Sequence, residues 1–562
     1  MQPNPHVSKY VWLFIGVTLG LFLIVPIGQL IANSWLDNGQ FSLTYYQQIL
    51  GSGRFHTAFL NSLTVAAISS LTATVLAFIL AYTIHWSQLP NGYKKFLGIM
   101  AQFPMLLPTI TYGFAIIYTF GKKGLLTQLF GVQLIDNLYG FKGLWMGYTI
   151  YTLPIAFLLL NNTFFYLDKK TSLVSKLMGD NQWRTFKTSV VVPLIETLAM
   201  AFIQCFFLSF TDYGIPASIG GRYEVIATQL YNELLGSSPS FGRGAVVAIC
   251  MLIPSIISVI LLSKLAKYRI KPNQTQPIDL PRNRVSDYCL GTLSGFIILA
   301  VSSVFAVILV APFVQQWPYN LTPSISMLQS VLASTNLLQV YQNSIIVALL
   351  TALVGTIVSY TLALIAERTQ LWRNAKIASD GLAMISNTTP GMVLGIAYLM
   401  LFSGTSIANT LAIIVICNVV HYFATPYLMA KNALSKLNNG WELTAGLLGD
   451  SWIKSIFKVV LPNSFLTLLE IFSYYFINAM VTVSAVIFIA GAQTMVLTSK
   501  VKELEHYARF NEIFIVSLMI LLTNLAALAV IFGLRFYLKR RSASPRRTKK
   551  VPVLAQSIIK QS

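Results

Sequence analysis

Long apolar stretches, separated by short polar ones, recur along the whole chain of 562 residues. A helix needs about 20 mainly apolar residues to cross a bilayer, and about twelve stretches reach that length. They lie near 11–33, 57–85, 97–120, 141–166, 194–213, 243–265, 288–314, 340–366, 379–403, 407–430, 463–490 and 513–537. The pattern predicts an all-α polytopic membrane protein with about twelve transmembrane helices.

The apolar stretches form two similar sets. "FLNSLTVAAISS" from Phe59 matches "YQNSIIVALLTA" from Tyr341, and other residues agree at the same offset. The corresponding residues are Asn61-Ser62 and Asn343-Ser344, Pro108 and Pro390, and Gly113 and Gly395. Two tandem copies with the same number of spans predict two parallel six-helix domains related by a pseudo-twofold axis along the membrane normal. The paired prolines and glycines can let helices bend or pack closely.

Composition and charge agree with the membrane interpretation. Hydrophobic residues make up 55% of the chain and charged residues only 10%, against about 25% charged residues in soluble domains. The formal charge is +21, but its basic clusters directly follow apolar spans at 264–284 and 535–560, as the positive-inside rule predicts for cytoplasmic segments. Both chain ends are therefore expected in the cytoplasm. Nucleic-acid binding is not expected, because the clusters carry no DNA-binding motif and no interleaved aromatic residues.

The same clusters set the predicted domain boundaries. We expect a first transmembrane domain at 1–268 and a second at 287–540. The segment 269–286 is rich in Pro, Asn, Gln and charge, which is typical of a flexible cytoplasmic linker. Residues 541–562 form a basic tail. The four cysteines show neither a CxxC motif nor metal-ligand spacing, so we predict no metal site.

One polar, basic segment occurs twice in the sequence, once in each half, between the fourth and fifth predicted spans. "GDNQWRTFKTSVVVP" runs from Gly179 to Pro193, and "GDSWIKSIFKVVLP" runs from Gly449 to Pro462. The two copies share Gly-Asp, a tryptophan, basic residues and a closing proline, and the first copy is one residue longer. A single copy would be a basic loop that follows the positive-inside rule. Two matched copies favour a duplicated docking element made of Gly179, Asp180, Trp183, Pro193, Gly449, Asp450, Trp452 and Pro462.

These segments resemble the EAA loop of permease subunits of bacterial ABC importers. That loop reads EAA, three residues, Gly, nine residues, an aliphatic residue, one residue and Leu-Pro. The second copy keeps the spacing from Gly449 through Val459 to Leu461-Pro462. The name-giving positions hold Leu-Thr-Ala at 443–445 and Leu-Val-Ser at 173–175, so neither copy has the glutamate, although Glu442 is one position away.

The duplicated architecture is similar to the fused permeases that serve ferric iron, thiamine, phosphonate or polyamine uptake. The resemblance implies a permease subunit in the bacterial inner membrane that forms the translocation pathway. Each loop would then be a coupling helix seated in one of two separate ATPase subunits, and an extracytoplasmic binding protein would deliver substrate. ATP would bind the partner subunits, and this chain would hold no cofactor. It lacks the GxxxxGK[ST] phosphate-binding loop and is not expected to be an enzyme.

Two ionisable residues in or near the spans are candidates for the translocation pathway, because charge is costly at membrane depth. For Asp212, which is followed by Gly214 and Pro216, the alternative is a helix-end residue at the outer surface. For Glu470 the alternative is a polar contact between helices.

An ion-coupled secondary transporter is the main alternative for the whole chain, because such proteins can also have twelve spans in two parallel halves. That class calls for several buried carboxylates or broken helices near mid-membrane. The few carboxylates of this chain, and a repeated signal that lies in a loop, favour the importer. A membrane scaffold would not call for a duplicated polar segment.

Overall fold

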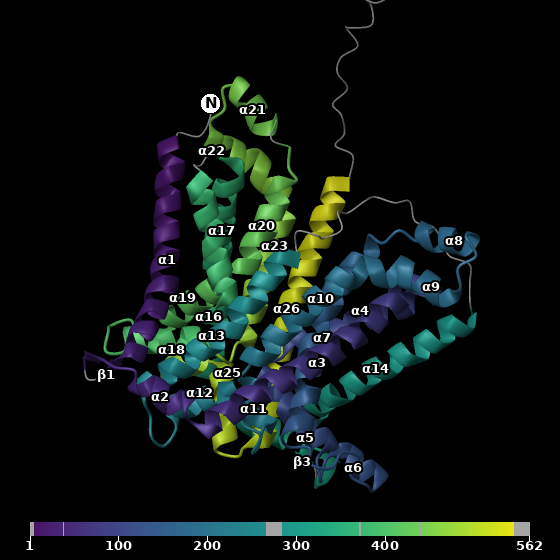
Figure 1. Ribbon diagram of the computed structural model, residues 1–562, viewed down its shortest axis with the longest axis vertical. Coiled ribbons are helices and arrows are strands. Elements are labelled where there is room, and N and C mark those ends of the chain that lie inside the picture. The colour runs from purple at the N-terminus through teal and green to yellow at the C-terminus, as the bar shows by residue number, and fades with distance from the viewer. Residues whose placement is uncertain are drawn as a thin grey trace, which may run out of the picture.

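The structure is a computed structural model that describes residues 5–37, 39–265, 284–317, 319–369, 373–438 and 440–543. Nearly all of the predicted linker, 269–286, and of the predicted tail, 541–562, lies outside these residues. The described part is built of helices, with two short antiparallel hairpins, β1–β2 and β3–β4. Figure 1 shows two groups of helices that share one end of the molecule, with α1 beside helices of the second half and α14 beside helices of the first.

The elements of the first half follow one another in the order α1 (Pro5–Trp35), β1 (Leu36–Asp37), β2 (Gln40–Phe41), α2 (Thr44–Leu50), α3 (Gly53–Trp86), α4 (Asn91–Gln102), η1 (Phe103–Leu106), α5 (Thr109–Phe120), α6 (Leu125–Phe130), α7 (Phe141–Phe165), α8 (Lys170–Leu177), α9 (Gln182–Phe186), η2 (Lys187–Val191), α10 (Val192–Thr211), α11 (Gly214–Ile219), α12 (Ile226–Leu235) and α13 (Phe241–Leu265).

The second half has a similar order, with the bent pair α19 and α20 in the place of α7: α14 (Arg284–Val310), η3 (Ala311–Phe313), β3 (Val314–Gln316), β4 (Asn320–Pro323), α15 (Ser326–Leu332), α16 (Thr335–Arg368), α17 (Arg373–Thr388), α18 (Gly391–Phe402), α19 (Leu411–His421), α20 (Ala424–Ser435), α21 (Gly440–Leu447), α22 (Trp452–Ser455), η4 (Ile456–Val460), α23 (Leu461–Val481), α24 (Val486–Ile489), α25 (Leu497–His506) and α26 (Phe510–Ala543).

The duplication extends to individual hydrogen bonds. The Ser62 hydroxyl in α3 accepts a 2.7 Å hydrogen bond from the backbone N–H of Ile226, the first residue of α12. The Ser344 hydroxyl in α16 accepts one of the same length from Leu497, the first residue of α25. The start of a helix leaves backbone N–H groups without intrahelical partners. In each half, an equivalent serine accepts a hydrogen bond from one of these groups.

The number of spans matches the prediction, but three of them are not straight. Nine helices of the described chain are long and apolar enough to cross a membrane, and three bent helix pairs raise the total to twelve. The bends are 111° between Asn91–Leu106 and Thr109–Phe130, 100° between Arg373–Thr388 and Gly391–Phe402, and 53° between Leu411–His421 and Ala424–Ser435. The apolar pattern predicts length and does not reveal such breaks.

The paired prolines account for the two sharp bends. Pro108 and Pro390 stand directly before α5 and α18. Proline lacks an N–H and pushes the preceding residue out of the helical region. Leu107 is accordingly extended, at φ −122° and ψ 148°. The expectation that these prolines bend the helices is confirmed.

The paired glycines allow two close helix contacts. A Cβ added to Gly113 of α5 would lie 1.9 Å from the Ser218 hydroxyl of α11. A Cβ added to Gly395 of α18 would lie 2.4 Å from the backbone oxygen of Ala485, just before α24. Small residues let membrane helices approach to backbone contact, and these glycines do so at equivalent places in both halves.

The first helix of each half packs against the other half. Helix α1 lies against α16, α17, α18 and α19, and α14 lies against α3, α4 and α5. Trp12 of α1 donates a 2.9 Å hydrogen bond to the Ser379 hydroxyl of α17, and the Thr83 hydroxyl of α3 lies 2.7 Å from that of Ser294 in α14. The halves are thus interlocked through exchanged helices, which the division at 269–286 did not anticipate.

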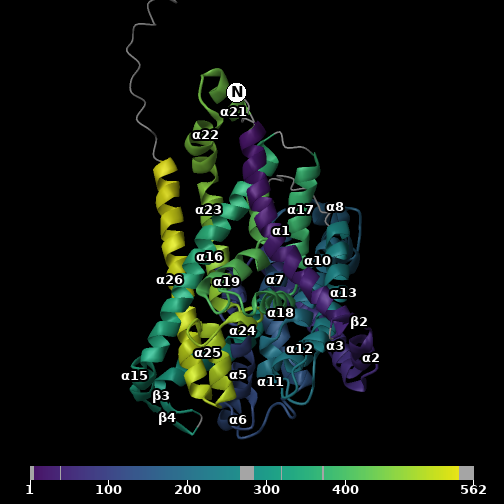
Figure 2. The same cartoon turned by 90° about the vertical axis from the view of Figure 1, so that its left-hand side faces the viewer.

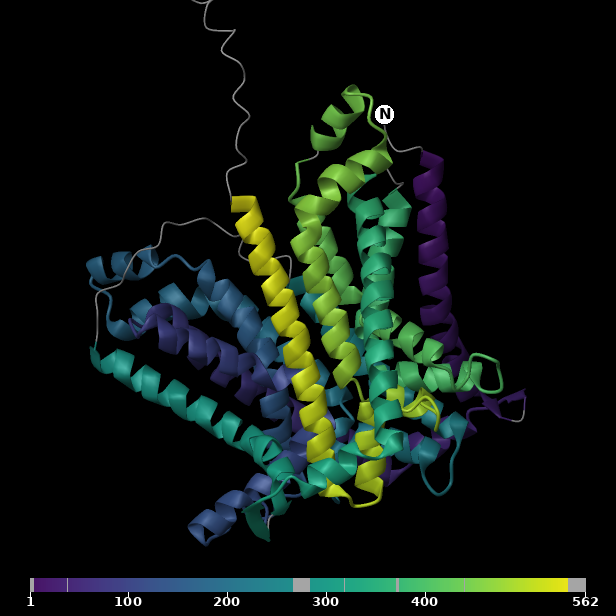
Figure 3. The same ribbon diagram turned by 180° about the vertical axis from the view of Figure 1, so that it is seen from behind.

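The two groups of helices diverge toward the end that carries α8, α9, α21 and α22. Figure 2 shows α5, α11, α12, α24 and α25 gathered at the opposite end, and the view from behind in Figure 3 shows the same divergence. We call the end with residues 170–186 and 440–455 the loop end, and the other the closed end.

Candidate functional site: two matched loops and a closed end

The first repeated segment forms a tight turn between α8 and α9. Gly179 has a φ of +84°, a backbone conformation that side chains disfavour. The Asn181 side chain then accepts a 2.8 Å hydrogen bond from the N–H of Arg184 and caps α9. Asp180 ties the turn together, because it accepts a 2.6 Å hydrogen bond from Ser175 of α8 and pairs with Arg184 at 3.0 Å.

The second segment repeats these features with different side chains. Gly449 has a φ of +82°. Ser451 caps α22 by accepting a 3.3 Å hydrogen bond from the N–H of Lys454. Asp450 pairs with Lys454 one turn later, as Asp180 does with Arg184. Both segments then pass through a short π-helix into α10 or α23.

The two segments share one register of caps and buried positions, although the first has one residue more before its closing proline. Counting from the glycines, the capping residues Asn181 and Ser451 fall at the same position. The buried positions then coincide, because Thr185, Val190 and Leu194 correspond to Ser455, Val460 and Ser464. An alignment that pairs Trp183 with Trp452 and Pro193 with Pro462 differs from this register by one residue.

The corrected register changes the partners of the tryptophans. Trp183 corresponds to Ile453, and both side chains are exposed, to 70% and 55%. Trp452 corresponds to Gln182, and its indole N–H is buried without a hydrogen-bond partner. Pro193 and Pro462 both occupy the first turns of their helices, where proline is tolerated, but they are offset by one residue.

The most exposed apolar side chains of the loop end stand directly before the two glycines. Leu177 and Met178 are 87% and 79% exposed, and Leu447 and Leu448 are 81% and 80% exposed. These positions correspond in the new register. Exposed apolar groups in a matched arrangement mark an interaction surface, and no sequence motif singled them out.

An ion pair anchors the second loop to the transmembrane bundle. Arg368, the last residue of α16, donates to both carboxylate oxygens of Glu442 in α21, at 2.7 and 2.8 Å. It also donates to the backbone oxygens of Leu437 and Asn438. In the first half, the ammonium group of Lys169 lies 5.8 Å from the ring of Trp86, the last residue of α3. The loops are alike in form and differ in how they are held.

The structure places the two pathway candidates apart. Asp212 follows α10, is 7% exposed and accepts a 2.9 Å hydrogen bond from the N–H of Ile215 in α11. Glu470 lies in α23 and pairs with Arg535 of α26. Asp212 thus stands at a helix end but is buried rather than exposed at the surface, and Glu470 makes the contact between helices. A substrate contact by either stays a prediction. Within the described ranges, no group of three or more His, Cys, Asp or Glu residues could hold a metal ion.

At the closed end, a lysine of the second half lies over two tyrosines of the first. The ammonium group of Lys502 in α25 lies 5.6 Å from the ring centre of Tyr213 and 5.4 Å from that of Tyr231 in α12. The two tyrosine rings are stacked at 4.9 Å. Glu505 completes the cluster with a 2.5 Å contact to Lys502. Burial raises the pKa of the Glu505 carboxyl, and the nearby Lys502 partly offsets that rise.

Tyr231 and Lys502 are counterparts in the two halves. Each stands five residues after the helix start that its serine caps, at Ile226 and Leu497. Two equivalent positions that meet must lie close to the axis relating the halves. In the sequence alone, Lys502 is only an imperfection of the charge pattern in an outer loop.

Comparison with known proteins decides the class. Residues 359–544 match the family described as the binding-protein-dependent transport system inner membrane component. This region runs from α16 to the end of α26 and includes the second loop and its Gly449. The protein is a transport permease. It is the multi-pass membrane subunit of an importer and is not itself an enzyme.

The relatives of the permease extend the similarity to the first half. The ferric transport system permease protein FbpB of Actinobacillus pleuropneumoniae is 25% identical over 499 residues, which cover 85% of this chain and 71% of the relative. The putative ferric transport system permease protein FbpB 1 of Haemophilus influenzae is 26% identical and covers 84% and 77%. The thiamine transport system permease protein ThiP of Haemophilus influenzae is 22% identical and covers 65% and 67%. An alignment of 499 residues includes both halves, as a fused permease requires.

Proposed function

We propose that the two loops of the permease are the docking sites of two separate ATPase subunits of an ABC importer. The observation that carries the proposal is the matched pair of exposed apolar tips, Leu177-Met178 and Leu447-Leu448, each held by a glycine turn. Two tips in equivalent positions call for two equivalent partners. The loop end is then cytoplasmic, and both chain ends lie on that side.

The divergence of the helices supports a mechanism. ATP bound between the ATPase subunits would draw the two loops together, and the interlocked halves would pivot. The closed end, where Lys502 meets Tyr213 and Tyr231, would then open toward an extracytoplasmic binding protein. Hydrolysis would restore the arrangement seen in Figure 3.

Among the substrates named for the relatives, ferric iron is favoured. The two ferric permeases align with 84% and 85% of the chain. The thiamine relative aligns with 65%, and a putative 2-aminoethylphosphonate permease, PhnU of Salmonella typhi, with 49%. In importers of this type the binding protein selects the substrate, so the permease would follow its choice.

The test uses the permease in liposomes together with the ATPase and the binding protein. Uptake of ferric iron should require ATP in the lumen that holds the ATPase, and an ion gradient alone should drive none. Uptake driven by a proton or sodium gradient without ATP would instead establish the secondary transporter. Thiamine and 2-aminoethylphosphonate, each with a binding protein specific for it, are the competing substrates.

The docking role has its own variant and control. Gly449→Asp adds a charged side chain at a position with φ +82° and open space around it. Gly131→Asp makes the same change at φ +69°, also with open space, in the loop after α6 at the closed end. Backbone strain is therefore matched. Co-purification of the ATPase should fall for Gly449→Asp alone, and equal co-purification for both variants would refute the docking site.

A further inference from the structure

An apolar crevice opens on the side of the bundle where the exchanged helix α1 meets the second half. Its cavity of about 220 Å³ lies between α1, α16 and α19, and an adjoining, more open one of about 510 Å³ continues it between α1 and α16. The two share Phe14, Ile15 and Val358 as lining residues. They form one crevice along α1.

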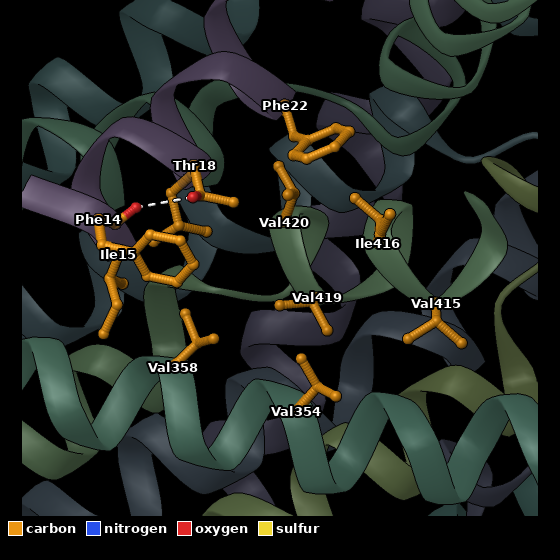
Figure 4. A pocket seen from close by; sticks show the side chains of 11 residues that line it. Phe14, Ile15, Thr18, Phe22, Val354, Val358, Val415, Ile416, Val419 and Val420 are labelled. Carbon is orange, nitrogen blue, oxygen red and sulfur yellow. Dashed lines mark hydrogen bonds between the residues drawn. The ribbon is translucent and has the colours of Figure 1, made fainter. Parts of the chain in front are cut away.

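The lining of the inner cavity is almost entirely apolar. Figure 4 shows Phe14, Thr18 and Phe22 facing Val354 and Val358 across the cavity, with the valines and the isoleucine of α19 at its side. Thr18 is the one polar side chain of the inner cavity, and its hydroxyl is bonded to the Phe14 backbone oxygen at 2.7 Å. The inner cavity therefore suits an apolar occupant, and the further hydroxyl groups of the crevice, those of Tyr10 and Thr361, line only its outer part.

The crevice is open to the surroundings along one edge and closed at its base. Phe14 is 75% exposed and Val354 is 40% exposed, whereas Leu19 and Val420 at the base are 6% and 2% exposed. In a transmembrane bundle the surroundings at this depth are hydrocarbon, so the occupant enters from the bilayer.

The length of the crevice matches one leaflet. Tyr10 and Phe22 mark its two ends on α1, and twelve residues of helix rise about 18 Å. Half of the hydrocarbon core of a bilayer is about 15 Å thick. Tyr10 lies in the first turns of the candidate span that begins at Ser8, and tyrosine at such a place sits at headgroup level.

The headgroup end is basic. Lys9 precedes Tyr10 and is exposed. Lys376 of α17 lies at a similar level. Trp12 stands three residues after Lys9, Ser379 stands three residues after Lys376, and these two side chains are hydrogen-bonded to each other. Positive charge at the surface of a membrane attracts anionic lipid. We propose that the crevice binds one acyl chain of a phospholipid from the leaflet in which α1 begins, and that the positive charge at this level, to which Lys9 contributes from the opposite side of α1, favours an anionic headgroup.

The bound chain fills the contact through which α1 holds the second half. The corresponding contact of α14 is closed by direct hydrogen bonds, Thr83 with Ser294 and Tyr93 with the Gly291 backbone oxygen. Helix α14 is thus bonded directly to α3, whereas α1 is bonded to α17 and α18 through Trp12 and Tyr398 and leaves part of its contact with α16 to the lipid. The proposal does not depend on what the permease transports.

The experiment places the full-length permease in nanodiscs of phosphatidylcholine that contain phosphatidylglycerol with a photoreactive group in mid-chain. After irradiation, the labelled peptides are mapped by mass spectrometry. Label is expected on residues 14–22 of α1 and 354–358 of α16. Label spread evenly over the exposed faces of α13 and α26 would overturn the proposal.

Variants test the site itself. Val358→Phe fills the crevice and should lower labelling of α1 about tenfold, while Leu353→Phe, on the exposed face of the same helix, should leave it unchanged. Ile416→Phe fills the crevice from α19 and replaces Val358→Phe if that variant does not fold. Unchanged labelling in a folded filling variant would overturn the proposal.

The headgroup is tested by charge. Lys9→Gln should weaken the preference for phosphatidylglycerol over phosphatidylcholine about fivefold, and Lys264→Gln, at the end of α13, should not. If free palmitate carrying the same photoreactive group labels α1 as well as phosphatidylglycerol does, and Lys9→Gln has no effect, the site takes any acyl chain and the phospholipid assignment is wrong.

Discussion

Arg368 and Glu442 join the end of α16 to the second loop through two parallel hydrogen bonds of 2.7 and 2.8 Å. The Arg368 side chain is 1% exposed and that of Glu442 is 16% exposed. Such a two-pronged pair fixes direction as well as distance. A movement that the proposed ATPase imposed on α21 would therefore pass to α16, which carries Ser344 in its first third.

Glu442→Gln should loosen the second loop without unfolding the bundle. Loss of one partner from a buried ion pair costs about 3–5 kcal/mol, and here the cost falls on a short surface helix. Amide hydrogen exchange of residues 440–448 should become faster, and ATP-driven uptake should fall. Arg373→Met removes an exposed arginine nearby and serves as the control. Unchanged exchange in Glu442→Gln would show that the pair does not hold the loop.

The corrected register predicts different roles for the two tryptophans. Trp183 is exposed at the surface proposed for docking, whereas Trp452 is partly buried with its N–H inside the protein. Exposed aromatic anchors contribute about 2 kcal/mol or more to binding, so Trp183→Ala should weaken ATPase binding about 30-fold or more. Trp452→Ala should lower thermal stability. Titration of the ATPase onto the permease in nanodiscs measures binding. If both variants lost the same binding affinity, Trp183 and Trp452 would have equivalent roles and the corrected register would be wrong.

This register shows what the sequence could and could not reveal. The spans, the duplication and the two loops follow from apolar length, from Asn61-Ser62 with its copy, and from Gly179 with Gly449. The tryptophans and closing prolines misled the alignment, because a residue type does not report whether its side chain is buried. The exchange of α1 and α14 was not predictable either, because an apolar helix pattern says that a helix is buried in lipid or protein but not which helices it contacts.

The lysine at the closed end provides a test of gating. Lys502→Met keeps an apolar chain of similar length and removes the cation that lies over Tyr213 and Tyr231. Each cation–π interaction contributes about 0.5–2 kcal/mol, so losing the two that Lys502 makes should shift the balance between closed and open states by about fivefold or more. ATPase activity without binding protein should rise. Lys500→Met is the control, because the Lys500 ammonium pairs with Glu503 in its own helix at 2.9 Å. A similar rise in both variants would refute the gate.

Two glycine substitutions should have opposite effects on stability. In Gly395→Ala the new Cβ would lie 2.4 Å from the Ala485 backbone oxygen, and a backbone atom cannot rotate away. Overpacking of this kind costs about 1–3 kcal/mol, so the thermal midpoint in nanodiscs should fall. In Gly381→Ala, within α17, nothing lies within 4 Å of the new Cβ. There the better helix propensity of alanine should stabilise the protein by up to about 1 kcal/mol. A midpoint that rises for both substitutions would mean that α18 and the α24 segment are not in backbone contact, and that Gly395 is not needed for the closed end to form.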